Sequence, residues 1–298
     1  MGTLAFVVPP EFDGCTINDF LRRGKGVSYR QIKSLKHQKP PMGLFCNGAH
    51  IRTVDLVRAG DLVALCWPER AAETALSAAP VPVLYEDEEL VVFNKPWDMP
   101  CHPAKKHQSD TLGNVFAAHC AAQGLILPFR PVNRLDKDTT GIVVAAKSQY
   151  TAAQLAGKIE KEYLAILCGC PSSVKGTVDA PIRRVDPVHI LREVSPEGQR
   201  AVTHYEVLAR GTEYSLARFQ LETGRTHQIR VHMAYLGCPL AGDTWYGGDT
   251  RIIERQALHC VCCHFSHPMS GKKVELSAPL YEPFKNALKN AYIPCNIE

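Results

Sequence analysis

Apolar positions near the N-terminus follow helical spacing and then give way to short strand-like runs. Residues 17–21 place apolar side chains on one helix face, and Ser28 with Gln31 three residues later matches a capping box. Two short apolar segments bounded by turn residues follow at positions 43–48 and 60–65. Helices and short strands in this order predict a small α/β module.

The rest of the chain is dominated by expected strands. They share β-branched or alternating apolar residues between turn signals, and they cover positions 90–95, 142–146, 161–169, 201–209 and 213–223. The last two flank Arg210-Gly211-Thr212, which predicts a hairpin. Few helices interrupt these strands. We therefore predict an α+β fold with a large, mixed or antiparallel twisted sheet and flanking helices.

Two helices are expected within this larger part. Ser148 is a suitable N-cap for a helix that reaches about Glu160. A second helix is expected to begin at a Thr226 cap and to end at Gly237, with basic residues in its first turns. Its N-terminus would be a natural site for an anion.

Composition and length suggest two folded parts. Residues 71–82 are small, end in prolines and lack apolar periodicity, which is typical of a linker. We therefore predict a small module over residues 1–70 and a larger domain over residues 83–298. The N-terminus lacks the basic start of a signal peptide, and no apolar run approaches the roughly 20 residues of a membrane helix. We expect a cytoplasmic protein without membrane contact, and nothing requires more than a monomer.

Twelve cysteines are scattered through the expected elements rather than framing a small secreted module. The densest cluster lies in residues 259–264, where strand alternation would place Cys260 and Cys262 on one face and Cys263 on the other. Structural zinc sites usually use paired cysteines in turns. We therefore expect buried thiols and no metal site.

The net charge of +4 permits a polyanionic partner without requiring one. Its distribution is more informative, because seven residues between Leu21 and Pro40 are Lys or Arg and none is acidic. A solvated helix surface is the ordinary explanation of such a run. The alternative hypothesis is RNA binding, with phosphate contacts from Arg22, Arg23, Lys25, Arg30, Lys33 and Lys36.

The candidate chemistry lies in the stretch Asn133-Arg134-Leu135-Asp136-Lys137-Asp138-Thr139-Thr140-Gly141, directly before an apolar strand. Its turn-forming composition predicts a tight loop carried on a rigid element. Asp136 is thereby placed at a strand entrance. For an isolated aspartate, closing a turn would be the ordinary role.

This interpretation changes because the whole stretch, and not one aspartate, resembles a known motif. Arg-Leu-Asp-Lys-Asp-Thr-Thr-Gly before an apolar strand resembles the active-site signature of the RluA family of pseudouridine synthases. Three further blocks resemble that family in the same order: Glu-Asp-x-x-Leu-Val-Val-x-Asn-Lys-Pro, Lys-x-Tyr-Leu and Gly-Arg-Thr-His-Gln-Ile-Arg. The N-terminal module resembles the alpha-L RNA-binding module of some ribosomal proteins. Asn133 departs from the pattern, since many members have His there.

The resemblance implies roles for individual residues. Asp136 matches the essential catalytic aspartate, Tyr163 the tyrosine that packs on the target base and can help remove a proton, and Arg225 the arginine that pairs with the aspartate. Arg134 matches the residue that fills the gap left by the displaced base. From the residues alone, Tyr163 also fits a strand core, and Arg225 fits a phosphate ligand at a helix start. His227, Gln228 and Arg230 share the basic helix, and a core or supporting role fits them as well as a direct role in the site.

The implied function is isomerisation of specific uridines in structured RNA, ribosomal or transfer. The reaction exchanges a sugar–nitrogen bond for a sugar–carbon bond without redox change, so no cofactor is expected. The sequence has no dinucleotide-binding, Walker or His-Glu-x-x-His motif. Two alternatives remain. One is a non-catalytic RNA-binding or ribosome-assembly protein on the same fold, and the other is a nucleoside glycosidase, which would ordinarily need a second acid to activate water.

Overall fold

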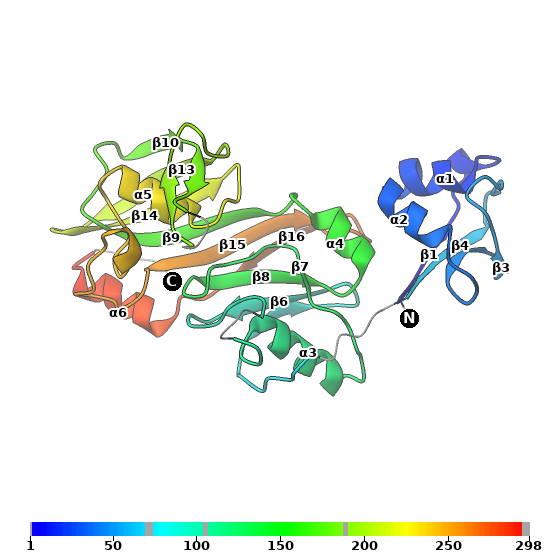
Figure 1. The fold of residues 1–298 in the computed structure, drawn as a ribbon, viewed down its shortest axis with the longest axis horizontal. Coiled ribbons are helices and arrows are strands. Elements are labelled where there is room, and N and C mark those ends of the chain that lie inside the picture. The colour runs from blue at the N-terminus through cyan, green and yellow to red at the C-terminus, as the bar shows by residue number, and fades with distance from the viewer. Residues whose placement is uncertain (1, 69–73, 104–106, 187–189, 294–298) are drawn as a thin grey trace.

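The computed structural model of the chain contains a four-stranded sheet near the N-terminus and a ten-stranded sheet further on (Figure 1). The structure describes residues 2–68, 74–103, 107–186 and 190–293. Of the predicted linker, residues 71–73 lie outside the described ranges, and residues 74–82 form neither helix nor strand. No helix in these ranges is long and apolar enough to cross a membrane.

The N-terminal sheet has the order β1-β4-β2-β3 and is antiparallel throughout. Its strands are β1 (Gly2–Val7), β2 (Gly43–Cys46), β3 (Ala49–His50) and β4 (Leu62–Trp67). The pattern analysis missed β1, although Leu4, Phe6 and Val8 are buried at every second position. They pack into the same core as Leu65 of β4.

Short helical segments cover this sheet. They are η1 (Pro10–Phe12), α1 (Ile17–Asp19), the π-helical turn η2 (Phe20–Gly24) and α2 (Tyr29–Leu35). The predicted capping box is confirmed, because the Ser28 hydroxyl accepts from the Gln31 backbone N–H while the Gln31 side chain accepts from the Ser28 N–H.

The large sheet has the order β10-β13-β14-β9-β15-β8-β6-β5, with β16 beside β15 and β7 beside β8. It is mixed, because β8 and β15 are parallel while the other neighbours are antiparallel. Its strands are β5 (Val83–Glu86), β6 (Leu90–Lys95), β7 (Arg130–Pro131), β8 (Thr140–Ala146), β9 (Glu160–Cys168), β10 (Lys175–Asp179), β13 (Val202–Arg210), β14 (Tyr214–Leu221), β15 (Leu258–Ser266) and β16 (Lys273–Ser277). The predicted α+β class and the predicted β13–β14 hairpin are confirmed.

The remaining elements flank this sheet (Figure 1). They are α3 (Leu112–Ala122), α4 (Gln149–Leu155), α5 (Gln228–Tyr235), η3 (Thr244–Tyr246), α6 (Glu282–Asn290) and the small hairpin β11 (Ile182–Arg184) with β12 (Arg192–Val194). Helix α4 has the predicted Ser148 cap but ends before Gly157, whose φ of 72° leaves the helical region. The prediction of a helix to Glu160 was therefore too long.

Helix α5 also begins later than predicted. Its N-cap is His227, in a left-handed conformation with φ of 58°, rather than Thr226. The Gln228 side chain satisfies a backbone N–H near this helix end instead, because its Oε1 accepts from the Arg225 N–H at 2.9 Å. The predicted glycine end is confirmed: Gly237 has a φ of 74°, and the N–H of Cys238 reaches the Met233 carbonyl as in a Schellman motif.

The cysteine cluster in β15 does not alternate as predicted. A bulge between Cys260 and Cys262 shifts the register against β9, so that Cys260 pairs with Tyr163 and Cys262 with Glu162. Cys260 and Cys263 are consequently buried on the same face, and Cys262 lies on the other. Each described cysteine is a free thiol.

Helix α4 carries the contact with the N-terminal module (Figure 1). Tyr150 is buried in the core of that module, and its ring packs edge-to-face against Phe6 with the ring centroids 5.5 Å apart. Its hydroxyl donates a hydrogen bond to the Lys25 carbonyl at 2.8 Å. The Gln154 amide donates to the Gly26 carbonyl at 2.9 Å. The two sheets are therefore joined by side-chain packing as well as by the chain between them.

Candidate active site

The loop before β8 is held at every second residue. The Asn133 amide donates to the Ile142 carbonyl and accepts from the Val144 N–H, both at 2.9 Å, so it is tied to β8 on both sides. Leu135 is tied to Cys101, whose thiol lies 3.5 Å from the Leu135 N–H. Asn133 and Leu135 are thereby fixed on either side of Arg134, and both Arg134 and the following Asp136 line the same small pocket.

Lys95 holds the other end of the loop. It is fully buried, and its ammonium donates to the carbonyls of Pro96, Met99 and Lys137 at 2.7, 2.8 and 2.9 Å. These three bonds use all three ammonium protons. Burial lowers the pKa of Lys95 to about 8, with the nearby acids opposing the shift. The charged form therefore still predominates near neutral pH and links the end of β6 to the residue after Asp136.

Asp136 faces a cation at the start of α5. Arg230 Nη1 lies 3.4 Å from Asp136 Oδ2, and the Asp136 side chain is 28% exposed while that of Arg230 is 5% exposed. Asp136 and Arg230 are 94 residues apart in the sequence, so local structure does not bring them together. The fold of the large sheet places the two segments side by side. The carboxylate is thus oriented by a buried charge while one side stays open to solvent.

Arg230 is itself fixed by Asp243 and two aromatic rings. Its Nε and Nη2 donate to the two Asp243 oxygens at 2.6 and 2.8 Å, and both side chains are buried. The guanidinium also lies over the rings of Tyr246, at 4.9 Å, and Trp245, at 5.5 Å. A bidentate pair with ring stacking leaves Arg230 little freedom, so Nη1 is held toward Asp136.

His227 approaches the same carboxylate oxygen, with Nε2 3.8 Å from Asp136 Oδ2. The Tyr246 hydroxyl accepts from the Arg192 backbone N–H at 3.0 Å and lies 2.7 Å from His227 Nδ1. Because burial lowers the pKa of His227 to about 4, the ring is neutral near pH 7. We assign the Tyr246 hydroxyl as the hydrogen-bond donor to Nδ1 of the neutral ring. The ring proton is then on Nε2, which faces Asp136.

A small pocket of about 60 Å³ opens beside these groups. Asp136, Arg230, His227 and Tyr163 line it, together with Arg134, Leu135, Thr139, Leu221, Arg225, Gln228, Ile229 and Leu258. Tyr163 comes from β9 and is buried, and burial next to Cys260 raises its pKa well above the ordinary value. The neutral phenol is suited to pack against a ring rather than to remove a proton.

The predicted pairing of Arg225 with Asp136 is wrong. Arg225 is exposed, and its Nε donates to the Arg200 carbonyl at 3.0 Å. Arg230, five residues later, makes the contact with the aspartate instead. Arg225 remains on the pocket wall, as does the exposed Arg134, so both can meet a ligand that enters from solvent.

The predicted basic surface is mostly exposed. Its exposed members are Arg22, Arg23, Arg30, Lys33 and Lys36. Lys25 differs, because its ammonium lies over the rings of Phe6 and Phe20 at 5.3 and 5.8 Å. Lys25 therefore contributes to the core of the module and to its contact with α4 as well as to its charge.

Asp243, Tyr246 and Lys95 were not singled out from the sequence. The run Gly242-Asp243-Thr244-Trp245-Tyr246-Gly247 carried a usable signal, since an acid followed by two aromatics between glycines is unusual for a plain loop. Lys95 carried a weaker one, a lysine at the end of an otherwise apolar strand. Neither signal shows that these residues converge on Asp136.

Comparison with known proteins gives consistent results. The profile of a family described as RNA pseudouridylate synthase matches residues 89–235. An uncharacterized RNA pseudouridine synthase of Bacillus subtilis, YjbO, is 38% identical over 271 residues, which is 89% of this chain and 95% of the relative. Ribosomal large subunit pseudouridine synthase D of Vibrio cholerae is 41% identical over 220 residues, 67% of this chain and 68% of the relative.

Among solved structures, the chain is similar to human RNA pseudouridylate synthase domain containing 4. The TM-score is 0.59 and the identity 26%, with 72% of this chain and 94% of that chain covered. The match covers nearly all of that chain, so the similarity extends well beyond one motif.

Proposed function

We propose that this chain, which belongs to the RNA pseudouridylate synthase family, converts selected uridines of structured RNA into pseudouridine with Asp136 as the catalytic carboxylate. One observation carries the assignment. The Asp136 carboxylate reaches a pocket from a loop that is fixed at alternate residues, and its Oδ2 faces the buried Arg230. Such a group is preorganised for chemistry rather than for closing a turn.

The reaction breaks the bond between sugar C1′ and uracil N1 and forms a bond from C1′ to C5. N1 gains a hydrogen and the C5 hydrogen leaves to water, so atoms balance without a cofactor. Asp136 can serve as a nucleophile, as a base or as a stabiliser of a cationic sugar. Each role needs the carboxylate held next to the sugar or the base of the reacting uridine, and Arg230 and His227 hold it in place.

The pocket also suggests how a base is accommodated. A uridine within folded RNA must leave its stack before it can react. Tyr163 offers a buried aromatic wall to the base, and Arg134 is exposed at the pocket edge, where a planar guanidinium can stack on the neighbouring bases. We assign Tyr163 to packing on the target uracil. We assign Arg134 to filling the gap that the displaced uracil leaves in the RNA stack.

Large-subunit ribosomal RNA is our first candidate substrate, because Vibrio relatives with about this similarity are named for that subunit. Transfer RNA is the second candidate. We further propose that the protein acts as a monomer in the cytoplasm. The exposed basic residues of the N-terminal module would hold either RNA through its phosphates.

A tritium-release assay tests this function. Unmodified transcripts of large-subunit ribosomal RNA and of transfer RNA, labelled at uracil C5, are incubated with the protein without added metal or cofactor. We expect release from one RNA class, and Asp136→Asn to slow it by at least about a thousandfold. Asp98→Asn is the matched control, because Asp98 contacts the Lys137 side chain of the same loop and should retain most of the rate.

The outcomes separate the alternatives. Tight RNA binding without release from either transcript would favour the non-catalytic RNA-binding protein. Free uracil in place of pseudouridine would favour the glycosidase. Undiminished release by Asp136→Asn would place the catalytic group elsewhere.

A further inference from the structure

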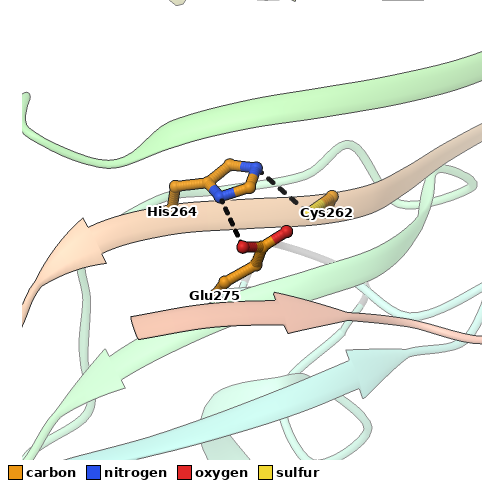
Figure 2. A group of neighbouring side chains, drawn as sticks. All are labelled: Cys262, His264 and Glu275. Carbon is orange, nitrogen blue, oxygen red and sulfur yellow. Dashed lines mark hydrogen bonds and ion pairs between the residues drawn. The ribbon is translucent and has the colours of Figure 1, made fainter. Parts of the chain in front are cut away.

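A second cluster of reactive side chains lies on the large sheet, outside the pocket of Asp136. Cys262 and His264 are two residues apart on β15, and Glu275 is the direct partner of His264 on β16. Figure 2 shows the imidazole between the other two side chains, with one nitrogen turned toward each. A sulfur, a nitrogen and a carboxylate oxygen from these residues all lie within 4.8 Å of one another.

The distances suit a bound metal ion. Cys262 Sγ lies 3.2 Å from His264 Nε2. Zinc–sulfur and zinc–nitrogen bonds at a tetrahedral angle would separate these atoms by about 3.5 Å, so only a few tenths of an ångström of adjustment are needed. Glu275 Oε2 lies 3.8 Å from His264 Nδ1, and its side chain is 72% exposed, which leaves it free to swing toward the same ion.

The strand register explains why the three meet. The bulge in β15 turns Cys260 and Cys263 toward the core and leaves Cys262 on the same face as His264. Glu275 joins them across the β15–β16 ladder. Strand pairing fixes the backbone beneath the cluster, so all three donors are placed without loop ordering.

The surroundings favour a cation. Glu162 of β9 is paired directly with Cys262, and Glu160 is paired with His264, so further carboxylates stand on the same face. Arg218, at 3.6 Å from Glu162, and the lysines of the same surface, Lys158, Lys161 and Lys273, offset part of this charge. A thiolate added to this group of acids would need compensation by positive charge.

We propose that Cys262, His264 and Glu275 form a binding site for a divalent metal ion of the zinc class, with water in the fourth position. Thiolate, imidazole and carboxylate together select zinc rather than magnesium or calcium, which prefer oxygen ligands alone. His264 binds through Nε2, and Cys262 gives its thiol proton to solvent as the ion binds. The ion cross-links β15 to β16 and is separate from the isomerisation.

Metal titration of the full chain tests the site. Zinc binding is measured by competition with a chromophoric chelator, and cobalt is added separately to detect thiolate-to-cobalt charge-transfer absorption. We expect one equivalent of either ion and a rise in melting temperature. Loss of an outer partner of a metal ligand typically costs 10–100-fold in affinity. Cys262→Ser and His264→Ala, which remove direct ligands, should therefore cost at least about 100-fold.

Two further variants keep the result interpretable. Glu275→Gln changes an exposed side chain, so it should fold normally and still weaken zinc binding. Cys170→Ser removes another half-buried thiol outside the cluster and should bind zinc like the original chain. Absence of binding by the original chain would overturn the proposal. So would equal binding by Cys262→Ser, because the metal would then be held by other cysteines.

Discussion

At the scale of single residues, the distinction between Arg225 and Arg230 decides how the candidate site works. Arg230 is buried and joins Asp243 to Asp136, whereas Arg225 is exposed and donates to a backbone carbonyl. Only a planar guanidinium can bridge both acids at fixed angles. An amine in its place would keep the charge and lose the geometry.

We therefore predict that Arg230→Lys reduces the isomerisation rate by about 10²–10³-fold, as is typical when one preorganised donor is lost. Arg225→Lys should change the rate by only a few-fold and should act mainly on RNA binding. Single-turnover tritium release with saturating protein measures the first effect, and filter binding measures the second. Comparable rate losses in both variants would contradict the assignment of Arg230.

The sequence could locate this site but could not choose its arginine. Both arginines lie in the motif Gly-Arg-Thr-His-Gln-Ile-Arg, and a helix starting at Thr226 would have favoured the earlier one. The left-handed His227 delays the helix to Gln228 and buries Arg230 in its first turn. That conformation depends on Tyr246 and on strand β13, which are distant in sequence, so local pattern does not contain it.

At the scale of elements, Gly141 lies where β8 pairs with the parallel strand β15, opposite Cys260. Its φ is 108°, and a Cβ built on it would lie 2.2 Å from the Cys260 carbonyl oxygen. Gly157 also has a positive φ, 72°, but open space surrounds it. An alanine at Gly157 would therefore meet backbone strain alone. An alanine at Gly141 would meet the same strain and a steric clash as well.

We predict that Gly141→Ala lowers the free energy of unfolding by more than about 4 kcal/mol or prevents folding, the range in which strain and overpacking combine. Gly157→Ala should cost about 1–2 kcal/mol, the ordinary penalty of left-handed backbone for a residue with a Cβ. Urea titration followed by circular dichroism measures both. Equal costs would show that the close approach of β8 and β15 relaxes easily.

Elements with local causes were predicted from the sequence, and elements with distant causes were not. The Ser28 capping box, the β13–β14 hairpin and the glycine end of α5 each depend on neighbours within a few residues. Strand β1 was missed because its partner β4 lies about sixty residues later. The bulge at Cys260 exists only against β9, so strict alternation misplaced Cys262.

At the scale of the whole molecule, the N-terminal module and the large sheet meet at α4. Tyr150 is inserted in the module core, and two carbonyls near Lys25 accept from α4 side chains. The exposed cations of η2 and α2 are thereby presented from a docked module rather than from a free tether. A docked module would contribute a fixed set of phosphate contacts to each bound RNA.

Charge reversal tests whether that surface holds RNA. We predict that Lys33→Glu with Lys36→Glu weakens RNA binding and lowers the slope of log affinity against log salt by about 1.5, because each lost phosphate contact removes roughly 0.7–0.9. Lys285→Glu with Lys289→Glu, on the exposed face of α6, is the matched control, since both pairs move the formal net charge from +4 to 0. Filter binding across a range of salt concentrations gives both slopes. If the two double variants lose affinity equally, net charge rather than the module surface governs binding, because only position differs between them.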